Sequence, residues 1–160
     1  MRIRRLTEAD APFLERMMLL AGFPPDRPLP PDPLSLPHAR RFLEGWGRAG
    51  DVGVMALSDT GSPVGAAWAR RLDEPLLRDE SGAPVAEVAI AVEEGARGGG
   101  TGAALLRALE DEAAGDGHRA LALGVSPRNP AVRLYRRAGY ELVGEGERGL
   151  VMIRRLGEGA

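Results

Sequence analysis

The sequence predicts an α/β fold of the α+β kind, in which a mixed, mostly antiparallel sheet of six or seven strands is combined with about four helices. Three observations predict it. Short apolar or alternating runs indicate strands throughout the chain, and longer segments with apolar residues at helical spacing lie between them. A glycine-rich turn at 95–102 joins a strand to a helix. A length of 160 residues predicts a single domain spanning 1–160.

The first part of the chain predicts a strand and two helices. Residues 2–6 alternate in polarity, which indicates an opening strand. Thr7 offers a helix N-cap, and apolar residues at helical spacing continue to Gly22. Seven of the 13 prolines fall within 23–37, which predicts an irregular loop because proline lacks the backbone N–H that a helix needs. A second helix is expected over 38–50.

The middle of the chain predicts three strands and a turn into a helix. Strands over 52–57 and 64–70 flank a short polar segment, which indicates a hairpin. A charged loop at 73–84 precedes a third apolar strand at 85–92. The glycine-rich turn at 95–102 then leads into a helix with alanine and leucine at helical spacing.

The last part predicts a strand, a short helix and a closing hairpin, over 120–125, 129–138, 140–143 and 150–156. A helical crossover of about 25 residues separates the strand at 120–125 from the third central strand, so these two are expected to be parallel neighbours. Only a short glycine- and glutamate-rich segment joins the last two strands, so they are expected to pair antiparallel.

Composition excludes several classes of protein. A net charge of −2 gives no general attraction to nucleic acid or an anionic membrane. The absence of cysteine excludes disulfides and thiol nucleophiles, and the absence of lysine excludes a Walker phosphate loop and a Schiff base. No cluster has metal-ligand spacing, so no metal is expected. No signal peptide or membrane-spanning run is evident, and a cytoplasmic protein is expected.

The glycine-rich turn is the main candidate for ligand binding. Glycines allow positive φ and close approach of a ligand, and a helix N-terminus presents unpaired N–H groups that suit a diphosphate. An ordinary tight turn would explain the same residues. A Rossmann dinucleotide site would need Gly at first, third and sixth positions with an acidic partner on a following strand, and no register of the turn provides this.

Two stretches resemble the signatures of the GNAT acetyltransferases. Val92, followed five residues later by Arg97-Gly-Gly-Gly-Thr-Gly102, is similar to the acetyl-CoA signature of that family. Asn129-Pro-Ala-Val-Arg-Leu-Tyr135-Arg-Arg-Ala-Gly-Tyr140 is similar to its second signature, with tyrosine in place of the usual final phenylalanine. Glu94 also replaces a frequent proline. The resemblance is clear across 85–143 and faint over the first 50 residues.

The resemblance implies an N-acetyltransferase with acetyl-CoA as co-substrate and an amine as acceptor, and a sheet that splays between its two parallel strands. It implies that the cofactor contacts Ile90, Ala91, Val92, Arg97, Gly98, Gly99, Gly100, Thr101, Gly102, Ala103, Asn129 and Tyr135. It also implies an acceptor site built from 23–37, Trp46, 73–84 and 144–149, and it leaves homodimerisation open. Nothing in the sequence selects the acceptor amine.

Tyr135 and Glu87 are the candidate catalytic residues. The resemblance places Tyr135 near the sulfur of the cofactor, where it could protonate the leaving thiolate; the alternative is a helix tyrosine that packs on the sheet. Glu87 is the lone charge in an apolar strand. It could accept the proton that an amine loses on attack, and the alternative is a solvated glutamate at a sheet edge. Asn129 could also cap its helix, and His118 is expected in a surface loop.

Two other functions stay open. A non-catalytic acyl-CoA-binding sensor of the same fold would keep the glycine-rich turn without needing a base. A Rossmann-type protein would bind NAD(H) in place of coenzyme A.

Overall fold

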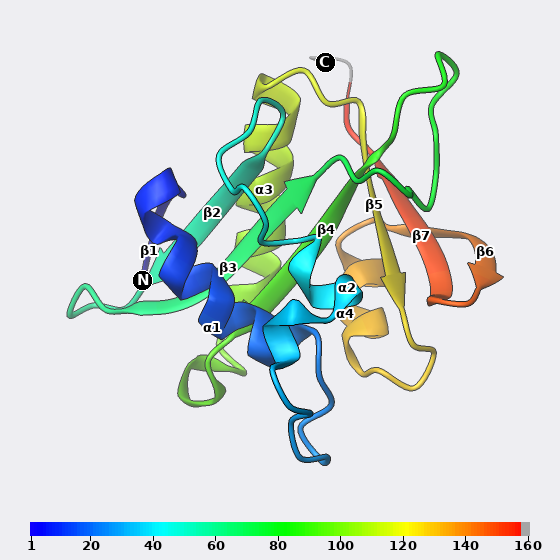
Figure 1. Ribbon diagram of the computed structural model, residues 1–160. Helices are drawn as coiled ribbons and strands as arrows, with labels where there is room; N and C mark the ends of the chain where they lie inside the picture. The colour runs from blue at the N-terminus through cyan, green and yellow to red at the C-terminus, as the bar shows by residue number, and fades with distance from the viewer. Residues whose placement is uncertain (158–160) are drawn as a thin grey trace.

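A seven-stranded mixed sheet organises the chain in the computed structural model, which describes residues 1–157 (Figure 1). Its strands are β1 (Arg2–Arg5), β2 (Val52–Leu57), β3 (Pro63–Arg70), β4 (Ala86–Val92), β5 (Ala120–Val125), β6 (Glu141–Gly146) and β7 (Gly149–Arg155). The order across the sheet is β1-β2-β3-β4-β5-β7-β6, and only β4 and β5 pair in parallel. The predicted fold class and parallel pair are confirmed. The last three residues of the expected domain 1–160 lie outside the described residues.

Helices cover both faces of this sheet. They are α1 (Ala11–Ala21), α2 (Pro37–Arg40), α3 (Thr101–Gly115) and α4 (Ala131–Arg137), with 3-10 turns η1 (Glu8–Asp10), η2 (Pro33–Ser35) and η3 (Glu94–Ala96). In Figure 1, α1 and α2 lie on one face and α3 lies on the other. No helix within residues 1–157 has the length and apolar character needed to cross a membrane.

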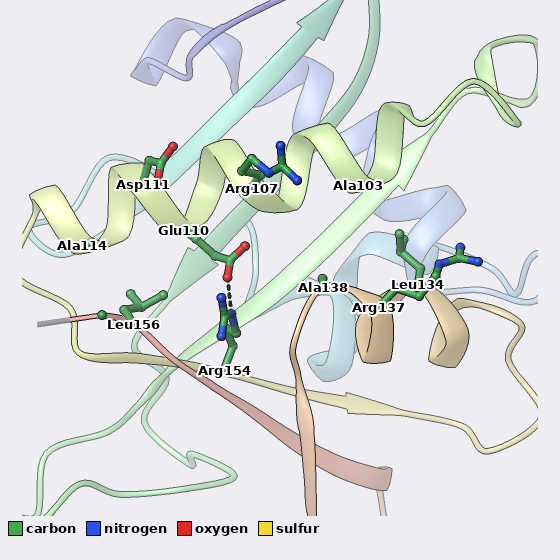
Figure 2. Close-up of a pocket in the computed structure, with 11 residues that line it drawn as sticks. Ala103, Arg107, Glu110, Asp111, Ala114, Leu134, Arg137, Ala138, Arg154 and Leu156 are labelled. Atoms are coloured by element: carbon green, nitrogen blue, oxygen red, sulfur yellow. Dashed lines mark hydrogen bonds and ion pairs between the residues drawn. The ribbon is translucent and has the colours of Figure 1, made fainter. Parts of the chain in front are cut away.

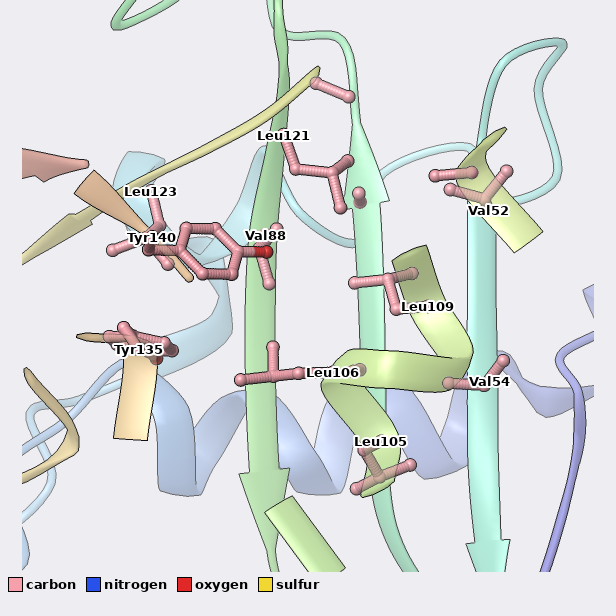
Figure 3. Packing of buried hydrophobic residues seen from close by; sticks show 14 of the residues in the cluster. Val52, Val54, Val88, Leu105, Leu106, Leu109, Leu121, Leu123, Tyr135 and Tyr140 are labelled. Atoms are coloured by element: carbon pink, nitrogen blue, oxygen red, sulfur yellow. The ribbon is translucent and has the colours of Figure 1, made fainter. Parts of the chain in front are cut away.

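Two apolar layers hold the helices to the sheet because successive strand residues point to opposite faces. The α3-side cluster includes Val54, Val88, Leu105, Leu106, Leu109, Leu121, Leu123, Tyr135 and Tyr140 (Figure 3). The α1-side cluster includes Phe13, Leu14, Met17, Met55, Trp68, Ala89 and Ala91. Trp68 is fully buried there and donates its indole N–H to the Phe42 carbonyl at 2.9 Å, so it is a core residue.

The second helix is shorter than the sequence predicts. It was expected over 38–50, yet α2 ends at Arg40 and turns follow it. Gly45 and Gly47 adopt φ values of +64° and +107°, which a right-handed helix does not allow. The carbonyls of Arg41 and Phe42 accept hydrogen bonds from the side chains of Arg70 and Trp68. Tertiary contacts have therefore replaced the helical hydrogen bonds in this segment.

His118 is buried, so the expectation of a surface-loop histidine is wrong. Its residue is 5% exposed, and its Nε2 lies 2.8 Å from the carbonyl oxygen of Gly50. Burial lowers the pKa of its imidazole below the ordinary value. The partner is 68 residues away along the chain, so local sequence contains no signal for this contact.

The two parallel strands separate soon after they meet. β4 and β5 pair only at Ala86 with Leu121 and at Glu87 with Ala122. The rest of β4 continues alongside β3 alone, up to the pair formed by Gly65 and Val92. The predicted splay is confirmed, and it leaves the second half of β4 with a free side.

Candidate active site

Backbone groups of β4 face the gap that the splay opens. The N–H of Glu93 donates to the Val64 carbonyl at 2.8 Å, so the backbone polar groups of Glu93 are directed toward β3. Hydrogen-bonding direction alternates along an antiparallel ladder, and therefore the N–H and C=O groups of Val92 and Ile90 point away from β3. The Val92 carbonyl accepts a hydrogen bond from Arg97 Nε at 3.0 Å, which agrees with that direction. An extended ligand could pair with this side of β4 as an added strand would.

The glycine-rich turn at the end of β4 presents unpaired backbone N–H groups. Gly98 and Gly100 have φ values of +86° and +80°, which fold the chain into the first turn of α3. A Cβ built on Gly98, Gly99 or Gly100 would meet no atom within 4 Å, so the approach is open. Over residues 1–157, no acceptor is hydrogen-bonded to the N–H groups of 98–103. These groups, at the positive end of a helix, suit a diphosphate.

Small residues after the turn bring α3 and α4 together. A Cβ on Gly102 would lie 3.1 Å from Leu134 Cδ2, closer than an ordinary contact. The Thr101 hydroxyl is directed at the Ala96 carbonyl, 3.4 Å away. Asn129 Oδ1 accepts the N–H of Ala131, the first residue of α4, at 2.9 Å, although the N-cap position itself is Pro130.

Tyr135 is packed inside the α3-side cluster. Its residue is 9% exposed, and its ring centroid lies 5.8 Å from that of Tyr140 (Figure 3). Burial raises the pKa of its phenol to about 12. The alternative considered from the sequence, a helix tyrosine that packs on the sheet, is therefore confirmed for Tyr135. The same burial keeps the phenol protonated at neutral pH, which is the state a hydrogen-bond donor needs.

Glu87 is buried at the point where β4 and β5 part. Its residue is 1% exposed, so the alternative of a solvated edge glutamate is wrong. One carboxylate oxygen accepts the N–H of Leu76 at 2.8 Å, and the other pairs with Arg148 Nη1 at 3.1 Å. Burial raises the pKa of this carboxyl, and the bonds to Leu76 and Arg148 offset only part of that effect. A carboxylate with a raised pKa is a stronger base than an exposed one.

Glu87 and Tyr135 lie on opposite faces of the sheet. Alternation along β4 places Glu87 on the same face as Ala89 and Ala91, which belong to the α1-side cluster. Tyr135 belongs to the α3-side cluster. The carboxylate of Glu87 and the phenol of Tyr135 are therefore on opposite sides of the gap between β4 and β5.

Arg148 is a site residue that the sequence did not single out. It lies in the turn between β6 and β7 and reaches both Glu87 and the carbonyl of Glu74, the latter at 2.8 Å. Arg148 thus ties the loop at 73–84 and the turn at 144–149 to β4. Its position as the one basic residue in a glutamate- and glycine-rich turn was the available signal.

A pocket of about 520 Å³ runs along α3 from Ala103 to Ala114. It lies between α3, α4 and the end of β7, and Figure 2 shows Arg107 and Arg137 on the two helices that border it. An ion pair between Glu110 and Arg154 spans its floor (Figure 2). Arg107 and Arg137 make no ion pair among residues 1–157, so two guanidinium groups without a carboxylate partner border this pocket.

Comparisons with known proteins agree on one family. A family model described as the acetyltransferase (GNAT) family matches residues 16–140. A ribosomal-protein-alanine N-acetyltransferase from Brucella melitensis is similar at 28% identity, with a TM-score of 0.73, over 98% of this chain and 100% of that one. A GNAT superfamily phosphinothricin acetyltransferase from Sinorhizobium meliloti, solved with acetyl-CoA, is similar at 25% identity and a TM-score of 0.71, over 98% and 89%.

A third similar structure is a GCN5-related N-acetyltransferase from Kribbella flavida, at 26% identity and a TM-score of 0.66, with 97% of each chain covered. A search of curated proteins finds no match.

Proposed function

Because the chain belongs to the GNAT family of acetyltransferases, we propose that it transfers the acetyl group of acetyl-CoA to the amine of a small molecule or peptide. The observation that carries this proposal is the gap beside β4, where the backbone of Ile90 and Val92 faces no strand and ends at an open turn of unpaired N–H groups. The phosphinothricin acetyltransferase at 25% identity was solved with acetyl-CoA, which supports the same co-substrate.

Acetyl-CoA fits the chemistry of these groups. Its pantetheine amides would pair with the N–H and C=O groups of Ile90 and Val92, while Ala91, whose backbone is directed toward β3, would line the gap. Its diphosphate would accept hydrogen bonds from the N–H groups of 98–103 at the start of α3. Asn129 accepts the N–H of Ala131 at the start of the helix that carries Tyr135, so it would position that helix against the cofactor.

The reaction we propose is direct attack by the amine. Acetyl-CoA supplies a thioester, whose C–S bond breaks as the amine nitrogen forms the new C–N bond. Glu87, five residues before Val92 on β4, accepts the proton that the nitrogen loses through intervening water molecules on the α1 face. A backbone N–H of β4 near Val92 donates to the carbonyl oxygen as charge develops there. Tyr135 donates to the leaving sulfur, and exchange with solvent returns both side chains to their starting states.

Thermal unfolding with acetyl-CoA, coenzyme A and NADH tests the binding half of the proposal. A ligand at 100 times its Kd stabilises a protein by about 2.7 kcal/mol, which corresponds to roughly 5 to 10 °C for a chain of this length. We expect this shift from acetyl-CoA and coenzyme A. A shift from NADH alone would refute the proposal in favour of a dinucleotide-binding protein.

Release of free coenzyme A thiol tests the catalytic half. The acceptor panel contains amino acids, a polyamine, phosphinothricin and a peptide with N-terminal alanine; the last two follow the acceptors named for two similar structures. We expect thiol release that depends on at least one amine, with the acetylated amine identified by mass. Binding of acetyl-CoA without amine-dependent thiol release across the panel would instead indicate a non-catalytic acyl-CoA sensor.

A further inference from the structure

Arg148 contacts both the buried carboxylate of Glu87 and the solvent. Glu87 is 1% exposed, and its two carboxylate oxygens are bonded to groups from two different loops. Oε2 accepts the Leu76 N–H at 2.8 Å, and Oε1 accepts a hydrogen bond from Arg148 Nη1 at 3.1 Å. The side chain of Arg148 is 30% exposed. A proton that leaves or reaches Oε1 through water therefore passes beside this guanidinium.

The turn that carries Arg148 lies directly against β5. A Cβ built on Gly124 would lie 3.2 Å from the Arg148 carbonyl oxygen and 3.4 Å from Arg148 Cβ, so a larger residue there would press on Arg148. Both neighbours of Gly124 along the strand belong to the α3-side cluster, so Gly124 faces the α1 side, as Glu87 does. The next residue of the turn, Gly149, has a φ of +89°, and a Cβ there would lie 2.5 Å from the Val125 carbonyl oxygen. Glycines in the strand and in the turn thus let Arg148 cross β5 to reach β4.

A second hydrogen bond fixes the orientation of the Arg148 guanidinium. Its Nη2 donates to the carbonyl oxygen of Glu74 at 2.8 Å while Nη1 donates to Glu87. The planar fork of a guanidinium makes two such contacts in a fixed geometry, which the ammonium group of a lysine does not reproduce. Each carboxylate oxygen has two lone pairs, so Glu87 can still accept a hydrogen bond from water at Oε1. The carboxylate is thus held in one orientation without being saturated.

Two other arginines lie near Glu87, and neither is bonded to it. Arg70 stands opposite Glu87 in the pairing of β3 with β4, but its guanidinium is bonded to Asp51 at 3.0 Å. Arg41 follows α2 and acts on Glu87 through its charge. The residue opposite Glu87 on β5 is an alanine, and the loop before β4 contributes a backbone N–H. Burial raises the pKa of Glu87, and that N–H, Arg148 and Arg41 lower it. Within residues 1–157, Arg148 is the one side chain bonded to this carboxylate.

We propose that Arg148 is a positioning residue for the base: it holds Oε1 of Glu87 in place and stabilises the side chain as a carboxylate anion, ready to accept a proton from water. This inference rests on the proposed function, since it concerns the base of the same site. Without Arg148 the buried carboxylate would lose its paired charge, and a buried charge without a partner takes up a proton instead. Replacing Arg148 should therefore shift the pH range in which the base works, while the base itself remains.

The pH dependence of kcat/KM tests this role. An opposite charge within 4–6 Å lowers the pKa of a carboxyl by about 1 to 3. Arg148→Met removes the charge, so the pH above which the wild-type profile flattens should move up by about 1 to 2 pH units. At pH 6 we expect kcat/KM to fall about 10- to 100-fold, with most of the loss recovered by pH 9. Arg148→Lys keeps the charge and should shift the profile less.

Arg155→Met is the matched control. Arg155 ends β7, and its ion pair with Glu141 is exposed, with 69% and 72% of the two side chains accessible. This variant removes an arginine from the same hairpin without touching Glu87, so its pH profile should match that of the wild type. Unfolding temperatures of the three variants establish that each is folded.

A double variant separates positioning from direct contact with the acceptor. If Arg148 acts through Glu87, adding Arg148→Met to a Glu87→Gln protein should change kcat/KM by less than about threefold at any pH. The same substitution in the wild-type background should give the larger, pH-dependent loss. An equal loss in both backgrounds would overturn the inference, because Arg148 would then act on the substrate itself.

Unfolding temperature gives a readout that does not need turnover. The folded-state pKa of Glu87 lies above its unfolded value, so the ionised carboxylate is a cost at high pH, and Arg148→Met should increase that cost. The deficit of this variant relative to the wild type should be larger at pH 7 than at pH 4, where Glu87 is protonated in both proteins. We expect the two deficits to differ by roughly 3 to 10 °C, the equivalent of 1 to 2 pH units. In a Glu87→Gln background the deficit should not change with pH.

Two results would overturn the inference while leaving the acetyltransferase proposal intact. One is a profile of folded Arg148→Met that is parallel to that of the wild type. The other is a deficit in unfolding temperature that is equal at pH 7 and pH 4, which a purely structural role of Arg148 would produce. If no amine is acetylated, the proposed function itself fails, and the positioning role fails with it. The unfolding measurement still decides whether Arg148 stabilises the anion of Glu87.

Discussion

Replacing Glu87 with glutamine should separate catalysis from stability. The amide keeps the shape of the side chain and an oxygen that can accept the Leu76 N–H. Arg148 loses its ion pair, but its side chain is 30% exposed and water can solvate the charge. The buried carboxylate itself is lost, and with it the base that we assign to the reaction.

The sign of the stability change follows from the pKa of Glu87. Burial raises that pKa above the ordinary value of 4.5, so stability from this group is present below pH 4.5 and is lost as pH rises through the folded pKa. At pH 7 the ionised carboxylate is therefore a net cost to the folded state. We expect the unfolding temperature of Glu87→Gln at pH 7 to equal or exceed that of the wild type.

The size of the rate loss depends on the acceptor. Without a base, only the fraction of amine that is already neutral can attack. At pH 7 that fraction is about a tenth for an α-amino group with a pKa near 8, and about one part in 10³ for a lysine-like amine with a pKa near 10.4. We therefore expect kcat/KM to fall about 10-fold for the first kind of acceptor and up to about 10³-fold for the second.

The assay is kcat/KM by thiol release from pH 6 to 9.5. The wild-type profile should flatten above the pKa of Glu87, whereas that of Glu87→Gln should rise about tenfold per pH unit until the pKa of the acceptor is reached. Glu44→Gln, a change at an exposed glutamate paired with Arg40, should match the wild type. A Glu87→Gln profile parallel to the wild type, with a loss below about threefold, would refute the base assignment.

Three further predictions follow from the site and the core. Tyr135→Phe should lower kcat by about 10², and because the pKa of the phenol is about 12, the loss should be constant from pH 6 to 9. Gly100→Ala and Gly61→Ala place a Cβ in open space at φ values of +80° and +84°. Each should cost about 1 kcal/mol, but only Gly100→Ala should weaken acetyl-CoA binding, by more than about tenfold; equal affinity in the two variants would contradict the assigned turn. Burial holds the pKa of His118 below 6.5, so the unfolded chain takes up the proton first and stability should fall as pH drops below 6.5. His118→Gln should flatten the unfolding temperature between pH 7 and 5, and an unchanged slope would show that another group is responsible.

Elements encoded by nearby residues were predictable from the sequence. The strand at 120–125 has the bounds of β5, and the strand at 85–92 differs from β4 by one residue. Apolar runs of strand length and the glycine-rich turn are local signals, so they can be recognised without knowing which segments they pack against. The prediction of a helix over 38–50 was wrong because the side chains of Trp68 and Arg70 donate hydrogen bonds to the carbonyls of Phe42 and Arg41. Helical spacing in the sequence does not reveal such contacts.

The candidate site divides in the same way. The glycine-rich turn at 95–102 and the segment from Asn129 to Tyr135 could be singled out from the sequence because each is a pattern of nearby residues. The environment of Glu87 was not, since its partner Arg148 is 61 residues away and Leu76 lies in an irregular loop. Burial of the carboxylate, and the pKa that results, depend on those distant groups.

By itself, then, the sequence determined the strand-turn-helix that offers backbone N–H groups to an anion, because glycine placement and helix periodicity act over a few residues. Only the tertiary structure decided which charges meet on the α1 face. The pairing of β3, β4 and β5 sets which side chains share that face, and the turn between β6 and β7 brings Arg148 to Glu87. Such contacts are fixed by sheet register and chain path, which no single segment encodes.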